Sequence, residues 1–469
     1  MTKRMEHDLI GDREIDNELY YGVQTARAQE NFHITGVTLS QFPTFITSLA
    51  KVKKACALAN YNLNLLEEHK KNAICEACDE IINGSLHDQF VVDVIQGGAG
   101  TSTNMNANEV IANRALEILG HEKGEYQHLH PNNDVNKSQS TNDSYPTAFR
   151  IALFEKLYEL VDSMKVLRKS CMVKAEEFKD VIKMGRTQLQ DAVPMTLGQE
   201  FHSYVTMIDE DIERLIGAQQ LVREMNLGAT AIGTGINSHP EYAHEVEQRL
   251  QEVTGRPFVT AKDLVEATQD TGAYVQISGV LKRVAIKISK ICNDLRLLSS
   301  GPRTGLNEIN LPAMQPGSSI MPGKVNPVIP EVVNQVAFQV IGADVTITMA
   351  SEGGQLQLNV FEPVIAYNLF NSINMMKNAF ETLSEKCIDG ITANEEHCKS
   401  LVLNSIGLVT ALNPYIGYEN STNVAKEALE SGRSVYDIVL EKQLLTQSEL
   451  DEIIKPENMI KPRMVSKKQ

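Results

Sequence analysis

Residues 332–350 read VVNQVAFQVIGADVTITMA, and few folds can accommodate such a stretch. Asp344 is its single charged residue, and apolar residues occupy most faces when the segment is drawn as a helix. A helix that is apolar on most sides must be buried on most sides. The helices of one chain can hardly surround it, so we expect other subunits to pack against it. Residues 355–380, where only Glu362 and Lys377 are charged, indicate the same.

Three other stretches predict long helices packed in a bundle. In each, apolar residues recur at steps of three and four, which is the heptad-like pattern of bundle helices. Alternation of the strand type is scarce along the chain. The predicted fold class is therefore all-α with a central long-helix bundle. The three stripes are Leu153, Leu157, Leu160, Met164, Leu167 and Cys171; Leu197, Phe201, Val205, Ile208, Ile212 and Leu215; and Ile277, Leu281, Val284, Ile288, Ile291 and Leu295.

The regions on either side of the bundle have a different character. We predict a small mixed N-terminal domain over residues 1–140, the bundle over 141–396, and a small helical C-terminal domain over 397–469. The N-terminal region contains one clear helical stripe, whose other face carries lysines. The stripe is Phe45, Ile46, Leu49, Val52, Cys56 and Ala59, and the lysines are Lys51, Lys53 and Lys54.

Composition limits the classes of partner and compartment. The chain has 469 residues and a net charge of −16, which disfavours nucleic acid or an anionic membrane as a partner. A site for an anionic ligand must then be locally positive or rich in donors. The first residues, 1–6, are charged and lack an apolar signal region. No run approaches about 18 uninterrupted apolar residues. A soluble, cytoplasmic protein is expected.

The cysteines and histidines do not predict a metal site. Cys75 and Cys78 form a CxxC inside an apparent helix with no second pair nearby, which favours ordinary packing. None of the eleven histidines shows a spacing such as HxxxH. His397 and Cys398 are a lone adjacent pair with an expected structural role.

Residues 317–326 read GSSIMPGKVN and predict a functional loop. The glycines and the proline prevent a continuous helix here. Ser318 and Ser319 provide hydroxyls, Lys324 a cation and Asn326 an amide. A loop with this mixture can hold a carboxylate and still move.

Three further stretches, together with this loop, resemble the aspartase/fumarase superfamily, whose members eliminate fumarate from a substituted succinate. They read GGAGTSTNMNANE at 97–109, HPNNDVNKSQSTND at 130–143 and GRTQLQDA at 185–192. The resemblance covers nearly the whole chain, from residues 21–25 to 413–418. It implies three domains, five bundle helices per protomer, a twenty-helix homotetramer core, and active sites built from three subunits.

The resemblance also implies the chemistry, which is reversible β-elimination of ammonia from L-aspartate. Ser318 would be the general base that removes the Cβ proton. A serine is a poor base unless backbone N–H groups, a cation and exclusion of water stabilise its alkoxide. The resulting aci-carboxylate needs fixed donors around it. No cofactor is needed in principle.

The family's substrate contacts map onto individual positions. Lys324 and Asn326 would hold the α-carboxylate, and Ser319 would donate to the β-carboxylate. Thr101, Ser140 and Thr141 resemble β-carboxylate contacts, whereas Asn142 and Thr187 resemble amino-group contacts; Thr101 can serve both. Gln188 and Met321 complete the predicted set. Singly, such residues are more often caps or turn formers, and Asn142 or Asp143 could cap the following helix. Residues 97–100 indicate close approach of the backbone to a ligand.

Position 188 separates members of the family. Fumarases usually carry a histidine there, paired with a glutamate that matches Glu331, but this chain has Gln188. A substrate ammonium already carries its proton, whereas a leaving hydroxide needs one, so glutamine favours ammonia release. Fumarate hydratase and a non-catalytic structural relative remain the alternatives. The partner of Glu331 is left open. For His130 both an anion contact and a polar surface role are left open.

Overall fold

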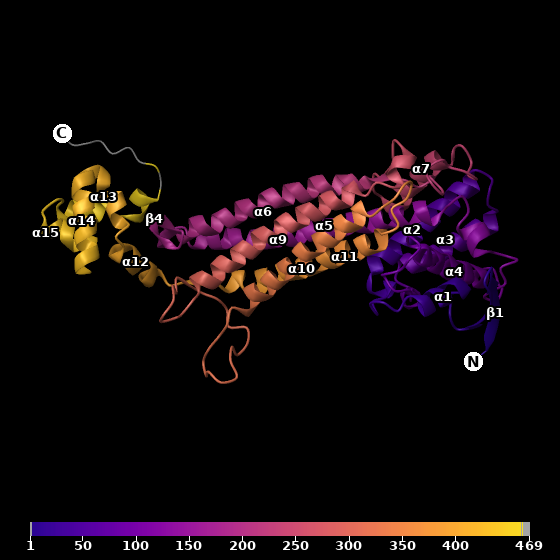
Figure 1. Ribbon diagram of the computed structural model, residues 1–469, viewed down its shortest axis with the longest axis horizontal. Helices are drawn as coiled ribbons and strands as arrows, with labels where there is room; N and C mark the ends of the chain where they lie inside the picture. The colour runs from indigo at the N-terminus through magenta and orange to yellow at the C-terminus, as the bar shows by residue number, and fades with distance from the viewer. Residues whose placement is uncertain (1, 461, 463–469) are drawn as a thin grey trace. The chain divides into compact units, whose positions relative to one another are not determined.

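The computed structural model describes residues 2–460 and 462, and it is mostly helical (Figure 1). The contacts divide the chain into two compact units. Unit 1 comprises residues 1–161, 213–283 and 338–375, and unit 2 comprises 162–212, 284–337 and 376–469. The same five long helices contribute a part to each of the two units, and the predicted long-helix fold is confirmed. They are α5 (Thr141–Glu177), α6 (Leu197–Gln219), α9 (Gly272–Leu298), α10 (Val328–Glu352) and α11 (Glu362–Lys386). The predicted division into three domains stays a prediction.

The three predicted stripes form the core of these helices. On α5, every residue from Leu153 to Cys171 in the stripe is at most 2% exposed. The stripes of α6 and α9 are buried in the same way, except that Ile212 is half-buried. Burial of these apolar side chains contributes on the order of 1.5–3 kcal/mol for each of the larger ones. Packing of the stripes, rather than intrinsic propensity, therefore stabilises the long helices.

Unit 1 adds a layer of shorter helices and an antiparallel hairpin. The helix α2 (Pro43–Asn62) packs against α3 (Glu68–Ile82) and α7 (Tyr242–Thr254). Phe45 of α2 contacts the rings of Tyr145 and Phe370 edge-on or tilted, with centroids 5.4 Å apart in both pairs. The predicted stripe of α2 is buried. The remaining elements are β1 (Lys3–Asp8), β2 (Gly11–Asp16), α1 (Val23–Asn31), α4 (Thr101–Ile118), β5 (Glu224–Met225), β6 (Val259–Thr260) and α8 (Leu264–Ala267).

Lys53, which lies on the face of α2 opposite the predicted apolar stripe, is fully buried. Its ammonium donates to Asn104 Oδ1, Asn136 Oδ1 and Gln139 Oε1 at 2.7, 3.0 and 2.8 Å. Three amide oxygens satisfy its three N–H donors, so this burial leaves no donor unpaired. All three acceptors belong to the 97–109 and 130–143 stretches.

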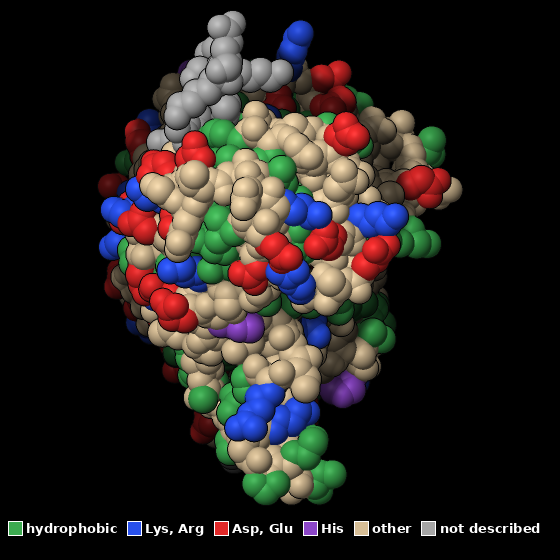
Figure 2. Space-filling view, turned by 90° about the vertical axis from the view of Figure 1, so that its left-hand side faces the viewer, with side chains coloured by type: hydrophobic (Ala, Val, Ile, Leu, Met, Phe, Trp, Pro, Cys, Tyr) green, Lys and Arg blue, Asp and Glu red, His purple; other side chains and the backbone are tan. Residues whose placement is uncertain are grey.

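Unit 2 contains a hairpin and a cluster of short C-terminal helices. β3 (Ile182–Thr187) and β4 (Gln190–Thr196) pair antiparallel across a two-residue turn, where Gln188 and Leu189 both have positive φ. The C-terminal helices enclose a small apolar core, and acidic, basic and apolar side chains are mixed on the face that Figure 2 shows. The other elements are β7 (Ile309–Asn310), β8 (Thr392–Ala393), α12 (Glu395–Asn404), α13 (Leu408–Ile416), α14 (Tyr418–Ser431), α15 (Val435–Glu441), α16 (Gln447–Ile453) and α17 (Pro456–Met459).

One face of α10 carries a stripe of apolar side chains that no other described part of the chain covers. It is the one described helix that is long and apolar enough to cross a membrane by length and composition. Asp344 interrupts it, and its carboxylate accepts from Ser278 at 2.7 Å and pairs with Lys282 at 2.6 Å. Three of its apolar side chains, Phe338, Val345 and Met349, are 59–68% exposed and recur along one helical face.

Candidate active site

The 317–326 loop lies in unit 2, between β7 and α10, and extends away from the long helices (Figure 1). Its two arms are tied together at the base. The N–H of Gly317 donates to the Lys324 carbonyl at 2.8 Å, and the Asn326 amide donates to the Gly317 carbonyl at 2.6 Å. A Cβ at position 317 would lie 2.4 Å from the Lys324 carbonyl oxygen, so the closure requires glycine.

Ser318 lies inside this closed loop with its hydroxyl held by the backbone. Its Oγ accepts hydrogen bonds from the N–H groups of Ile320 and Met321 at 3.2 and 3.0 Å. Donors that point at an oxygen stabilise negative charge on it. The local geometry therefore provides part of what a serine base needs.

The rest of the loop faces outward in the single chain. Ser319, Met321 and Lys324 are exposed, and among the described residues none forms a hydrogen bond or ion pair with the Lys324 ammonium. Ile320 is 83% exposed, which is unusual for a large apolar side chain. The loop thus presents a cation and apolar side chains to whatever approaches it.

In unit 1, residues 140–143 form the start of α5. The N–H of Ser140 donates to Asp143 Oδ1 at 2.9 Å, and the N–H of Asn142 donates to Ser140 Oγ at 3.2 Å. Ser140 therefore caps the helix with its hydroxyl, and Asp143 takes part in this reciprocal cap by accepting from the Ser140 N–H. Asn142 does not cap it with its side chain, because its amide donates to the carbonyl of Ala231 at 2.8 Å.

Two buried ionisable side chains, Asp143 and Lys53, stabilise the start of α5 through hydrogen bonds. Asp143 also accepts from the N–H groups of Gly228 and Thr230, and burial raises its pKa to about 7. Burial lowers the pKa of Lys53 to about 8. Asn104, which binds Lys53, also donates to Thr141 Oγ1 at 3.1 Å. The 97–109 and 130–143 stretches are thus joined through α2, and Lys53 is a supporting residue that sequence reasoning missed.

Thr101 is the exposed first residue of α4. Its hydroxyl donates to the Gly98 carbonyl at 2.7 Å, so its oxygen lone pairs remain available to a ligand. This arrangement suits acceptance from an ammonium better than donation to a carboxylate. The glycine at 100 serves packing, since a Cβ there would lie 2.4 Å from the Tyr145 ring. For Gly100, then, the close approach is to a side chain of the protein.

Thr187 and Gln188 lie at the exposed tip of the β3–β4 hairpin in unit 2. Buried charges hold its base: Arg186 pairs with Glu308 at 2.5 Å, and Lys183 pairs with Glu308 at 3.0 Å and with Glu200. Within unit 2, β3 and β4 pack against α12, α13 and α17, whereas the 317–326 loop projects away from the helices (Figure 1). The structure therefore places the predicted residues in three groups, at the start of α5 with α4, at the hairpin tip and in the loop.

Two histidines that the sequence singled out, His130 and His397, have structural partners. His130 Nδ1 accepts from the N–H groups of Asn132 and Asn133 at 3.0 and 3.4 Å, and burial lowers its pKa. It therefore caps the short π-helical segment Pro131–Val135, a third role besides the two left open. His397 bonds to the Leu306 carbonyl at 2.9 Å, which confirms its structural role.

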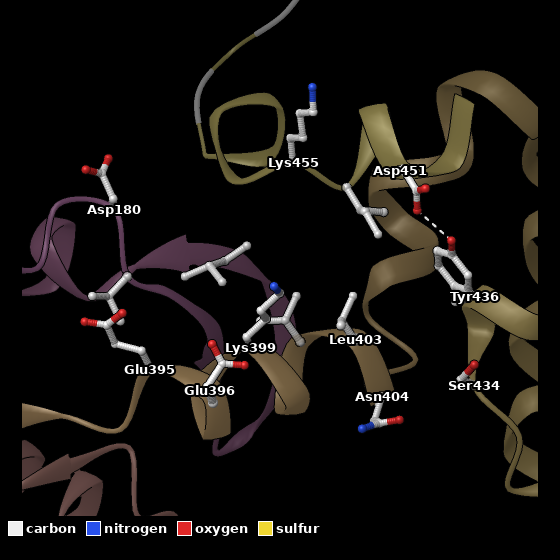
Figure 3. Close-up of a pocket in the computed structure, with 14 residues that line it drawn as sticks. Asp180, Glu395, Glu396, Lys399, Leu403, Asn404, Ser434, Tyr436, Asp451 and Lys455 are labelled. Atoms are coloured by element: carbon white, nitrogen blue, oxygen red, sulfur yellow. Dashed lines mark hydrogen bonds between the residues drawn. The ribbon is translucent and has the colours of Figure 1, made fainter. Parts of the chain in front are cut away.

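A cavity of about 710 Å³ in unit 2 lies between the start of β3 and the C-terminal helices (Figure 3). Charged side chains from α12, α16 and nearby turns line it, and Tyr436 donates to Asp451 at 2.5 Å within it. None of the residues predicted to bind substrate is among its lining residues.

Comparison with known proteins identifies the family. The family described as "Lyase" matches residues 11–342, and "Fumarase C C-terminus" matches 408–461.

The chain belongs to the aspartase/fumarase family of lyases.

Relatives named aspartate ammonia-lyase are similar over nearly their whole length. The one from Helicobacter pylori is 67% identical and covers 99% of both chains, and the one from Escherichia coli is 57% identical, covering 99% of this chain and 98% of its own. Two solved structures of this family share the fold. A cobalt-bound "fumarate lyase:delta crystallin" from Brucella melitensis has a TM-score of 0.96 at 54% identity, covering 98% of this chain and 100% of its own. A class II fumarase from Schistosoma mansoni has 0.92 at 35%, covering 98% and 99%.

Proposed function

We propose that this protein catalyses the reversible β-elimination of ammonia from L-aspartate to give fumarate. The observation that carries the proposal is the 57–67% identity over nearly the full length to aspartate ammonia-lyases, against 35% to a class II fumarase. Gln188, at the place where fumarases usually carry histidine, supports it. The substrate amine is already an ammonium, so it leaves as ammonia and no acid is needed at position 188.

In this mechanism Ser318 takes the Cβ proton. The electron pair of the broken C–H bond moves into the β-carboxylate, giving an aci-carboxylate. The C–N bond then breaks, a carbon–carbon double bond forms, and ammonia leaves. The two N–H groups that Ser318 Oγ accepts support this role, because they stabilise the alkoxide form. No cofactor takes part in the proposed steps.

The other residues bind the substrate. Lys324 holds the α-carboxylate by charge. The amide of Asn326 keeps a second N–H for the same group, since one donates to Gly317. Ser319, Ser140 and Thr141 donate to the β-carboxylate. Contacts to the amino group come from Thr101, Asn142, Thr187 and Gln188, and Met321 lines the site.

An assay with fumarate tests the reaction. We expect the absorbance of fumarate to fall when the protein is incubated with fumarate and ammonium, and to stay constant without ammonium. A fall without ammonium would indicate a fumarate hydratase instead. No fall in either condition would favour a non-catalytic structural relative.

We further propose a homotetramer whose sites each draw on three subunits. The uncovered apolar stripe of α10 supports association, because a long exposed apolar face is costly in water. The exposed tip of the hairpin and the projecting loop lie apart within unit 2, which supports sites completed by other subunits.

Mixing two inactive variants tests the composite site. Ser318→Ala and Thr187→Ala would each inactivate every site of a pure tetramer. If different subunits supply these residues to one site, subunit exchange creates sites with neither defect, and activity returns. Light scattering of each variant checks that the assembly is intact. An active monomer at high dilution, or no recovery despite demonstrated exchange, would contradict the composite site.

A further inference from the structure

Three side chains able to bind a metal ion converge on the segment that follows α4. They are His121, Glu125 and His128, and one ligand atom from each lies within 4.8 Å of the others. The two imidazole rings are stacked, with centroids 3.8 Å apart and planes 3° apart. His121 Nδ1 lies 3.6 Å from Glu125 Oε2. None of the three belongs to the proposed active site.

The backbone fixes the spacing of these three residues. The N–H of His121 donates to the Leu116 carbonyl at 2.9 Å, which ties the segment to the end of α4. The N–H of Glu125 donates to the Glu122 carbonyl at 3.2 Å, and that of His128 to the Glu125 carbonyl at 3.0 Å. The N–H of Glu122 also orients the Glu125 carboxylate, at 3.0 Å from Oε2. A bound ion would therefore find its ligands on a prepared backbone.

The remaining adjustment lies within reach of side-chain rotation. Ligand atoms at about 2.0–2.1 Å from a tetrahedral ion are about 3.3 Å apart. Starting from 4.8 Å or less, the ligand atoms must approach by no more than about 1.5 Å. Parallel rings do not direct two nitrogens at one point, so one ring has to turn. The His128 side chain is exposed and has room to do so.

We propose that His121, Glu125 and His128 bind one transition-metal ion of the zinc or nickel class, with water completing the coordination. Two imidazoles and one carboxylate suit these ions, whereas magnesium prefers oxygen ligands throughout. The nearby Lys123 ammonium is engaged elsewhere, 4.0 Å from the Tyr20 ring centroid and 3.6 Å from Glu117. A search for paired histidines at HxxxH spacing misses this set, because its middle ligand is a glutamate.

Nickel titration by calorimetry of the untagged full chain tests the proposal. We expect the wild type to bind one Ni²⁺ per chain. For His121→Ala and for His128→Ala we expect a dissociation constant at least tenfold larger than that of the wild type. His69→Ala is the matched control. His69 also pairs with a carboxylate, Glu67, at 3.4 Å on an exposed surface, and it belongs to no three-residue group among the described residues. This control should bind nickel like the wild type.

Copper electron paramagnetic resonance gives a second, independent readout. Cu²⁺ at the wild-type site should show hyperfine structure from two nitrogens, reduced to one nitrogen in either histidine variant. Circular dichroism confirms that the variants stay folded. Wild-type affinity in both histidine variants, no stoichiometric nickel binding by the wild type, or a copper spectrum that either substitution leaves unchanged would overturn the proposal.

Discussion

Replacement of Ser318 by alanine is expected to lower kcat for aspartate by at least about a hundredfold, or about 2.7 kcal/mol. The reason is that the substitution removes the proposed base, together with the oxygen that the Ile320 and Met321 N–H groups stabilise. The fold should be unaffected, because the residue lies on a projecting loop. Steady-state kinetics with the tetramer verified by light scattering would measure the effect.

A serine outside the site provides the control for this experiment. Ser299 directly follows the last residue of α9, and its hydroxyl donates to the Arg296 carbonyl at 3.3 Å. Ser299→Ala should leave kcat within about twofold of the wild type, which corresponds to less than about 0.5 kcal/mol. If Ser318→Ala retained more than about a tenth of wild-type kcat, the base would have to be another group.

Replacement of Lys324 by methionine is expected to cost about 2–5 kcal/mol of transition-state stabilisation, or about 30- to 5000-fold in kcat/KM. A protein of net charge −16 must place a cation where a dicarboxylate binds, and Lys324 presents an exposed ammonium on the loop. Methionine keeps much of the length of the side chain and removes its charge. The change should raise KM for aspartate, because the lost contact serves binding.

Lys3→Met is the matched control for this charge removal. Lys3 pairs with Glu14 at 2.8 Å on the exposed β1–β2 hairpin, and such a surface pair contributes little. This control changes the net charge by the same amount as Lys324→Met. Equal losses in the two variants would indicate a general effect of charge, and an unchanged kcat/KM for Lys324→Met would remove the residue from the site.

The sequence by itself determined the elements whose pattern is local. The stripes of α2, α5, α6 and α9 could be read from apolar spacing, because burial follows helical period closely. The 317–326 loop was predictable from its glycines and proline. The sequence also offered Asn142 and Asp143 as possible caps of the helix that begins at residue 141. Such a cap is a local feature, because a capping residue acts within one turn of its own helix. The family also followed from local stretches, since each motif is contiguous.

Tertiary structure alone decided what depends on distant partners. The sequence did not predict that Lys53 is buried. Its burial is possible because the amide oxygens of Asn104, Asn136 and Gln139 accept hydrogen bonds from its ammonium. The β3–β4 hairpin was missed because two short strands give little alternation, and its base is held by Glu308, more than a hundred residues away. His121, Glu125 and His128 are close in sequence, but their convergence depends on the turns after α4, which apolar periodicity does not record. Periodicity records which side of an element is buried, but it does not record which polar groups from other segments meet there.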